Sequence, residues 1–148
     1  MSARVGFLGG GQMASALAGG AVAAGFVKES DLAFTQPPTP RQQTLRERFP
    51  ASTVHDDPEP LFASCDRIVL SVKPHVLRAI GGSLRPFVTD NHLLVSVASG
   101  LTLQELSELL GCSRVIRVMP NTPSLVGEGA SAMAAGEGCQ QEDVAWVR

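Results

Sequence analysis

The stretch Val5-Gly6-Phe7-Leu8-Gly9-Gly10-Gly11-Gln12-Met13-Ala14 decides the fold. A short apolar run ends in three consecutive glycines, and an alanine-rich segment with helical spacing follows at once. Gly9, Gly11 and Ala14 match the pattern G-x-G-x-x-A, in which a strand, a tight turn and a helix follow one another. The first glycine permits the turn, the second lets the backbone approach a pyrophosphate, and Ala14 lets the helix pack close to the strand. Because the N-terminus of a helix presents free N–H groups, this stretch predicts a dinucleotide-binding turn; the alternative is a flexible turn without a ligand.

Beyond this turn, short apolar runs alternate with helical patterns. The expected strands cover 4–8, 32–35, 53–54, 67–72, 93–97, 115–119 and 130–134, and the expected helices cover 13–24, 41–49, 60–64, 75–80, 102–110 and 141–148. Gly25 and Gly81-Gly82 are the expected ends of two helices, and Thr102 with Glu105 predicts a capping box. The alternation indicates an α/β fold with a Rossmann-type doubly wound, mostly parallel sheet. The 148 residues suit one domain, 1–148, whose last helical pattern stops as in a truncated chain.

Composition excludes several classes of protein. The net charge of −2 gives no positive field for nucleic acid or for an acidic membrane surface. No apolar run reaches the roughly 18 residues of a membrane-spanning helix. Three cysteines without a C-x-x-C pattern, and a first strand that begins without a leader segment, indicate a reducing, cytoplasmic location. No metal site is expected, because the residues of the one suggestive cluster, His55-Asp56-Asp57, are consecutive and lack distant partners.

The end of the second expected strand bears on which dinucleotide binds. NAD sites usually carry Asp or Glu there, where the carboxylate binds the ribose 2′-OH. Here the strand ends in Thr35-Gln36-Pro37, and Asp31 precedes the strand instead of following it. Without a repelling acid, and with Arg41 nearby, the sequence favours NADPH and leaves NADH possible; the alternative is a neutral loop without preference.

Three further segments make the pattern specific. They are Ser71-Val72-Lys73-Pro74, Ser96-Val97-Ala98-Ser99-Gly100-Leu101-Thr102 and Arg117-Val118-Met119-Pro120-Asn121-Thr122-Pro123. Together with the opening stretch, they resemble the N-terminal, nucleotide-binding half of pyrroline-5-carboxylate reductase, in order and at the expected spacing. The resemblance implies that the V-K-P and A-S-G turns line the nicotinamide of the bound cofactor. Pattern and resemblance together indicate the cofactor-binding residues Leu8, Gly9, Gly10, Gly11, Gln12, Met13, Thr35, Gln36, Val72, Lys73, Pro74, Ala98, Ser99 and Gly100.

The resemblance also implies a reaction, the NAD(P)H-dependent reduction of 1-pyrroline-5-carboxylate to proline, the last step of proline biosynthesis. In this interpretation Lys73 orients the carboxamide or attracts a substrate carboxylate, and Asn121 offers an amide on a loop stiffened by prolines. The alternatives are a solvated lysine and a structural asparagine. Pro58 stands where relatives often place an asparagine near the adenosine.

Relatives in this family build the substrate pocket and a homo-oligomer from a C-terminal helical domain. That domain carries a Gly/Ser-rich segment and a P-G-G-T-like segment, and neither occurs in this sequence. No catalytic residue is therefore assigned. Two other functions stay open: a nucleotide-binding module without activity of its own, and a Rossmann reductase of the deazaflavin type, against which the M-P-N-T-P segment argues.

Overall fold

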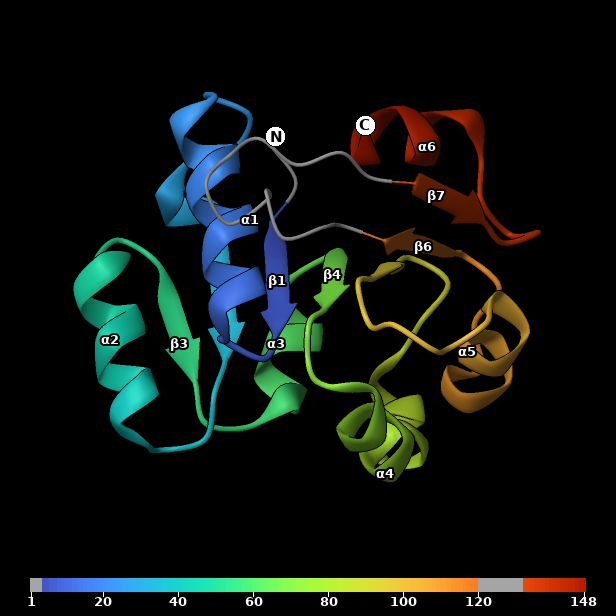
Figure 1. Ribbon diagram of the computed structural model, residues 1–148, viewed down its shortest axis with the longest axis horizontal. Coiled ribbons are helices and arrows are strands. Elements are labelled where there is room, and N and C mark those ends of the chain that lie inside the picture. The colour runs from blue at the N-terminus through green and yellow to red at the C-terminus, as the bar shows by residue number, and fades with distance from the viewer. Residues whose placement is uncertain (1–3, 120–131) are drawn as a thin grey trace.

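A computed structural model of the chain describes residues 4–119 and 132–148 (Figure 1). The strands are β1 (Val5–Leu8), β2 (Leu32–Thr35), β3 (Thr53–His55), β4 (Arg67–Leu70), β5 (Leu93–Ser96), β6 (Val115–Met119) and β7 (Ala132–Ala135). The helices are α1 (Gln12–Ala23), α2 (Pro40–Arg48), α3 (Pro58–Ser64), α4 (Pro74–Leu84), α5 (Leu103–Leu110) and α6 (Gln141–Val147), with 3₁₀ turns at Glu29–Asp31 and Arg85–Phe87. No helix in the described ranges is long and apolar enough to span a membrane.

The strands form one sheet in the order β3-β2-β1-β4-β5-β6-β7. All neighbouring pairs are parallel except β6 and β7, which are antiparallel. Val5 pairs with Leu32 on one side and with Arg67 on the other, so β1 lies inside the sheet and the chain order reverses there. The predicted Rossmann-type, mostly parallel sheet is confirmed.

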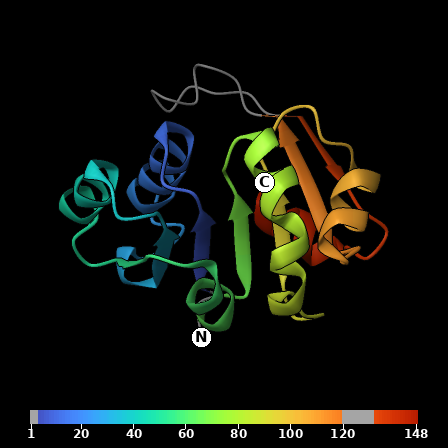
Figure 2. The ribbon, with the colours of Figure 1, turned by 90° about the horizontal axis from the view of Figure 1, so that it is seen from below.

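Helices cover the sheet on both faces, and each face has its own core (Figure 2). Ala14 and Ala18 of α1, Leu45 of α2 and part of α6 pack on one face with Phe7 and Phe34. The other face is covered by α3, α4 and α5. The central strands are buried on both faces, which is why they read as continuous apolar runs and not as an alternation.

Local signals account for two helix ends. Gly25 has φ +72°, and behind it the Phe26 N–H donates to the Ala21 carbonyl at 2.9 Å, so α1 ends in the left-handed cap that the sequence predicted. The predicted capping box at α5 is present, because the Thr102 side chain accepts from the Glu105 N–H and the Glu105 carboxylate accepts from the Thr102 N–H. These contacts fix where α1 and α5 end and begin relative to the sheet.

The predicted end of the fourth main helix is wrong. Gly81-Gly82 does not terminate α4, which continues to Leu84. A Cβ at Gly81 would meet the side chain of Leu109. This glycine, inside α4, therefore lets α4 and α5 approach each other closely. Burial of Leu84, which is 1% exposed, holds the last turn of α4 against the core. Tertiary packing therefore overrides the local preference of the two glycines.

Candidate functional site

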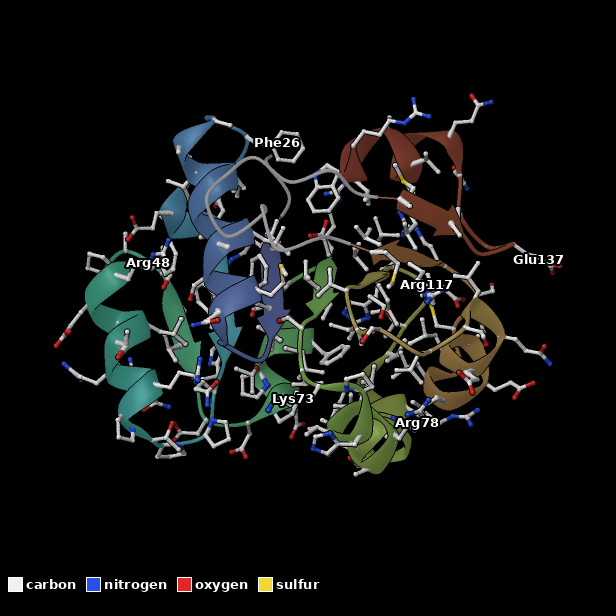
Figure 3. All side chains as sticks on the ribbon, viewed as in Figure 1. Phe26, Arg48, Lys73, Arg78, Arg117 and Glu137 are labelled. Carbon is white, nitrogen blue, oxygen red and sulfur yellow. The ribbon has the colours of Figure 1, made fainter. Side chains whose placement is uncertain are left out.

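The residues that the sequence predicted as a site all lie at one edge of the sheet. They occupy the ends of β1, β2, β4 and β5 and the turns that follow, and these four strands are parallel and adjacent in the order β2-β1-β4-β5. Figure 3 shows Lys73 at this edge, near the tip of β1, although β1 and Lys73 are distant in the sequence. Open α/β sheets bind ligands in the crevice at the carboxyl ends of their strands. This edge is therefore the candidate site.

The three consecutive glycines of the first turn have three different environments. Gly9 has φ +99°, and a Cβ there would lie 2.9 Å from Cγ1 of Val72, so the tight turn requires glycine. At Gly10 a Cβ would collide with Cδ1 of Leu45. At Gly11 the nearest atom to a Cβ would be Nη1 of Arg41, at 3.6 Å, which is ordinary contact. The fold itself does not require glycine at this third position, so Gly11 fits a place where a ligand approaches the backbone.

The start of α1 has the chemistry of an anion site. Gly11 is its N-cap and provides no side chain to satisfy the first N–H groups, which stay available to a ligand. A groove of about 570 Å³ lies between α1 and α2, lined by Gly11, Gln12, Arg41 and Arg48 among others. Arg41 was anticipated from sequence, whereas Arg48 was missed. The seven-residue spacing of the two arginines, two helical turns, was the available signal.

Gln36 joins the end of β2 to the glycine turn. Its Oε1 accepts a hydrogen bond from the Gly10 N–H at 3.0 Å, so that N–H is already satisfied within the protein. The Gln42 side-chain amide donates to the Gln36 carbonyl at 2.8 Å and to Oδ1 of Asp56 at 2.7 Å. A hydrogen-bonded chain thus connects the ends of β1, β2 and β3. Thr35 is 5% exposed, and within the described part of the chain its Oγ1 has no hydrogen-bond partner.

The turn after β4 contacts the glycine turn through Ser71, a residue that the sequence did not single out for this role. Its Oγ donates to the carbonyl oxygens of Leu8 at 2.9 Å and Gly9 at 3.1 Å. Lys73 follows as the exposed N-cap of α4, and Pro74 is the first residue of that helix. The V-K-P segment is therefore held directly beside the glycine turn.

The turn after β5 is buried at its start and exposed at its tip. Ala98 is 4% exposed and donates its N–H to Oγ of the buried Ser96 at 3.3 Å. Ser99 and Gly100 are exposed, and Gly100 has φ +78° with open space where a Cβ would be. Asn121, the remaining residue of interest, lies outside the described residues. The structure thus brings the four predicted segments together, and of the M-P-N-T-P segment it describes only Met119.

Other reactive side chains do not converge on this edge. Burial raises the pKa of the Cys65, Cys112 and Cys139 thiols, so none of them is an activated nucleophile. Cys65 is buried, whereas Cys112 and Cys139 are half-buried. Asp56 and Asp57 are exposed, and His55 belongs to β3. The described residues contain no cluster of three or more His, Cys, Asp or Glu side chains that could hold a metal ion.

Comparison with known families and sequences gives a consistent result. Residues 4–100 match the family described as "NADP oxidoreductase coenzyme F420-dependent". Pyrroline-5-carboxylate reductase 3 of Macaca fascicularis is 43% identical over 134 residues, which are 90% of this chain and 48% of that protein. Pyrroline-5-carboxylate reductase of Arabidopsis thaliana is 38% identical over 146 residues, 99% of this chain and 52% of that one. The chain thus spans about half the length of the curated relatives it matches.

Solved structures agree with the sequences. A pyrroline-5-carboxylate reductase from Coxiella burnetii superposes with a TM-score of 0.91 at 27% identity, covering 99% of this chain and 54% of that one. The Plasmodium falciparum pyrroline carboxylate reductase, solved with NADP bound, superposes with a TM-score of 0.84 at 31% identity, covering 99% and 53%. The chain therefore belongs to the NADP oxidoreductase, coenzyme F420-dependent family, and over almost its whole length it is similar to the nucleotide-binding half of pyrroline-5-carboxylate reductases.

Proposed function

We propose that this chain supplies the NADPH-binding half of an enzyme that reduces 1-pyrroline-5-carboxylate to proline. The observation that carries the proposal is the convergence of the four turns at one sheet edge, around the glycine turn. The third glycine of that turn, Gly11, could carry a side chain without disturbing the fold, so the space beside it is open to a ligand. The relatives named as pyrroline-5-carboxylate reductases, one of them solved with NADP, support it. Residues 1–148 form the cofactor domain in this proposal, and the free cysteines, Cys65 among them, favour a reducing compartment such as the cytoplasm.

In this proposal the first turn holds the pyrophosphate. The N–H groups that open α1 donate to the phosphate oxygens, and the partial positive charge of the helix N-terminus adds to the attraction. Because Gln36 occupies the Gly10 N–H, the donors are those of Gly11 and of the first residues of α1, Gln12 and Met13. Gly10 does not donate to the phosphate in this proposal. Its role is packing, since the missing side chain lets Leu45 of α2 lie against the turn.

The same groove explains a preference for NADPH. Arg41, at the start of α2, extends toward the glycine turn, where its Nη1 would lie 3.6 Å from a Cβ at Gly11, whereas Arg48 lines the same groove farther along α1, beside Gly19. The guanidinium of Arg41 suits a ribose 2′-phosphate, to which it donates charge-assisted hydrogen bonds, and Arg48 adds positive charge to the groove. Gln36 at the end of β2 is neutral and does not repel that phosphate. NADH, which lacks the 2′-phosphate, is expected to bind more weakly at the same place.

The turns after β4 and β5 serve the nicotinamide in this proposal. When bound, the cofactor supplies a hydride that adds to the carbon of the substrate C=N bond, while the nitrogen takes a proton. Lys73, exposed at the start of α4, offers a cation for the carboxamide or for the substrate carboxylate. The tip at Ser99 and Gly100 permits close approach of a ring, because no side chain stands over Gly100. The relatives are about twice as long, so other groups that grip the substrate are assigned to the length that this chain does not span.

Titration of NADPH fluorescence tests the proposal. Gly11→Val places two methyl groups where the pyrophosphate lies and is expected to weaken binding at least about tenfold, because the close backbone approach is lost. The matched control is Gly20→Val in the helix that follows, α1, where a Cβ meets nothing within 4 Å. Equal affinities of the wild type and Gly11→Val would overturn the proposal.

A second candidate is a nucleotide-binding module without catalysis of its own. The observation that favours it is that the chain spans about half of each relative. A third, a reductase that uses a deazaflavin cofactor, is suggested by the description of the matching family, although the relatives named above are pyrroline-5-carboxylate reductases. Reduction of pyrroline-5-carboxylate with NADPH, compared with reduced deazaflavin, separates these candidates when it is measured on a version of the chain extended to the length of the relatives.

A further inference from the structure

Arg78 connects the two turns that lie on the nicotinamide side of the site. It is an exposed residue of α4, four positions after Pro74, and α4 begins at the turn that follows β4. Its Nη2 donates to the carbonyl oxygen of Gly100 at 3.0 Å, across to the turn that follows β5. Figure 3 shows Arg78 between α4 and α5. The sequence did not indicate this residue, because the bond joins positions 22 residues apart.

The Gly100 carbonyl is a position where one bond can restrain a whole turn. Ala98 and Leu101 are buried on either side of the tip, at 4% and 1% exposure, so the ends of the turn are fixed. Between them, Gly100 has φ +78° and no contact that a Cβ would meet, so the tip has little packing of its own. The guanidinium of Arg78 holds the tip at a set distance from α4, and therefore from Lys73.

A second arginine makes an equivalent bond at the other end of α5. Arg85 donates from Nη1 to the Glu108 carbonyl at 3.1 Å, in the last turn of α5. Between the two arginines, Gly81 lets α4 and α5 approach each other closely at Leu109. The Arg85 bond ties the 3₁₀ turn after α4 to α5, whereas the Arg78 bond ties α4 to the turn at the carboxyl edge of the sheet. Arg85 is therefore a matched control for the loss of one exposed arginine–carbonyl bond.

We propose that Arg78 is a positioning residue, which fixes the spacing between the turns after β4 and β5 and so selects one orientation of the nicotinamide half of the cofactor. This inference rests on the proposed NADPH site and adds a residue to it. Arg78 acts through Gly100 and needs no contact with the cofactor. Loss of Arg78 should therefore affect only the nicotinamide half of the ligand, because in the proposed site the adenosine half binds on the other side of β1, between α1 and α2.

The test compares NADPH with 2′,5′-ADP, which carries the adenosine and the 2′-phosphate and lacks the nicotinamide. Dissociation constants are measured for the 148-residue wild type, Arg78→Ala, Arg78→Lys and Arg85→Ala. Arg78→Ala is expected to weaken NADPH binding about fivefold, the effect of one exposed charge-assisted hydrogen bond, and to leave 2′,5′-ADP binding unchanged. Arg78→Lys is expected to restore part of the loss, since it keeps a donor, and Arg85→Ala to leave both ligands unchanged.

The outcomes separate this inference from the proposed function. Unchanged NADPH affinity in Arg78→Ala, or an equal loss of affinity for both ligands, overturns the positioning role. The proposed NADPH site is not affected by that result as long as the wild type binds NADPH. Equal losses in Arg78→Ala and Arg85→Ala also overturn it, because they assign the effect to helix packing. If the wild type binds neither ligand, the proposed function fails, and this inference fails with it.

Discussion

Gly10 and Gly11 are adjacent, yet a side chain at each would meet very different surroundings. A Cβ at Gly10 would strike Leu45, which is 2% exposed and part of the core, so this glycine serves packing. A Cβ at Gly11 would meet only the end of a flexible arginine. At the scale of single residues, the turn therefore combines one glycine that the fold needs with one that the fold does not need and that we propose serves the ligand. Stability measurements and binding measurements should separate the two positions.

Gln36 is the residue expected to decide between the two cofactors. Gln36→Asp introduces a carboxylate that accepts from a ribose 2′-OH and repels a 2′-phosphate, so the NADPH/NADH affinity ratio should fall. The expected swing is on the order of 1–3 kcal/mol, the size of a charged hydrogen bond gained or lost. Isothermal titration with each cofactor measures the ratio.

Two variants control that experiment. Gln36→Glu has the length of the original side chain and keeps an acceptor for the Gly10 N–H, so its effect reports charge with the turn intact. Gln43→Asp adds the same charge on the exposed side of α2, where the Gln43 side chain donates to Glu47, and should leave the ratio unchanged. An unchanged ratio in both Gln36 variants would place the ribose elsewhere.

At the scale of elements, α4 contains two adjacent glycines with opposite expected responses to alanine. Gly81→Ala forces the Leu109 side chain to move and should lower the free energy of unfolding by about 1–2 kcal/mol. Gly82 is exposed, with nothing within 4 Å of a Cβ, so Gly82→Ala should raise it by about 0.5–1 kcal/mol through the reduced entropy of the unfolded chain. Urea unfolding of both variants measures the difference; the same sign for both would contradict the packing described for α4 and α5.

Helix α6 is held to the sheet by a buried carboxylate. Asp143 is 1% exposed and accepts from Nε and Nη2 of Arg114 at 3.0 and 2.6 Å, and from the Gln140 N–H at 2.9 Å. The hydrogen bonds from Arg114 hold the pKa of Asp143 below its ordinary value. Because the pKa in the folded state is the lower one, the carboxylate stabilises the fold fully above the unfolded value of about 4. This contribution is lost as the pH falls from there through the lowered pKa.

Asp143→Asn is therefore expected to cost about 1–3 kcal/mol at pH 7 and much less near pH 3. The fluorescence of Trp146 reports directly on α6, since it is the single tryptophan of the chain and its ring lies 4.6 Å from the Arg67 guanidinium carbon. Glu142→Gln removes the neighbouring exposed acid and serves as the control. A pH-independent difference between wild type and Asp143→Asn would show that the ionised pair does not anchor α6.

Local sequence patterns were enough to predict most elements but not every boundary. The strand at 32–35 and the capping box at Thr102 depend on neighbours in the chain, and both were predicted correctly. The extension of α4 past Gly81 depends on Leu109, and the requirement for glycine at position 10 depends on Leu45. The periodicity of a single segment cannot predict either contact, because the two partners are distant in the sequence. For the same reason the site segments were predicted from motif and resemblance, whereas Ser71 and Arg78 became visible only in three dimensions, and Arg48 had only its spacing from Arg41 as a signal.

At the scale of the whole molecule, the chain is expected to bind cofactor but to turn over poorly. Most of the rate gain in hydride transfer comes from holding the two reactants in position, and the relatives are about twice as long as this chain. Proline formation from pyrroline-5-carboxylate and NADPH should be small for the 148-residue chain and much larger for a version extended to the length of the relatives.

NADPH titration of both forms is the control for that comparison, and similar affinities are expected. Comparable turnover by the two forms would instead place a substrate site within residues 1–148. Lys73 would then be the first position to mutate, because it is the cation at the start of α4, on the nicotinamide side.

The interior place of β1 also sets an order of events during synthesis. Val5 pairs with Leu32 on one side, but its partner on the other side is Arg67, which the ribosome adds much later. At roughly 5–20 residues per second, the free edge of β1 waits on the order of 3–12 s for β4. During that interval β1, β2 and β3 can pair, and the open edge of β1 is an apolar strand without a neighbour. The half of the sheet that begins with β4 can therefore add to β1 only after Arg67 has been synthesised, whereas the β3-β2-β1 half can form before it.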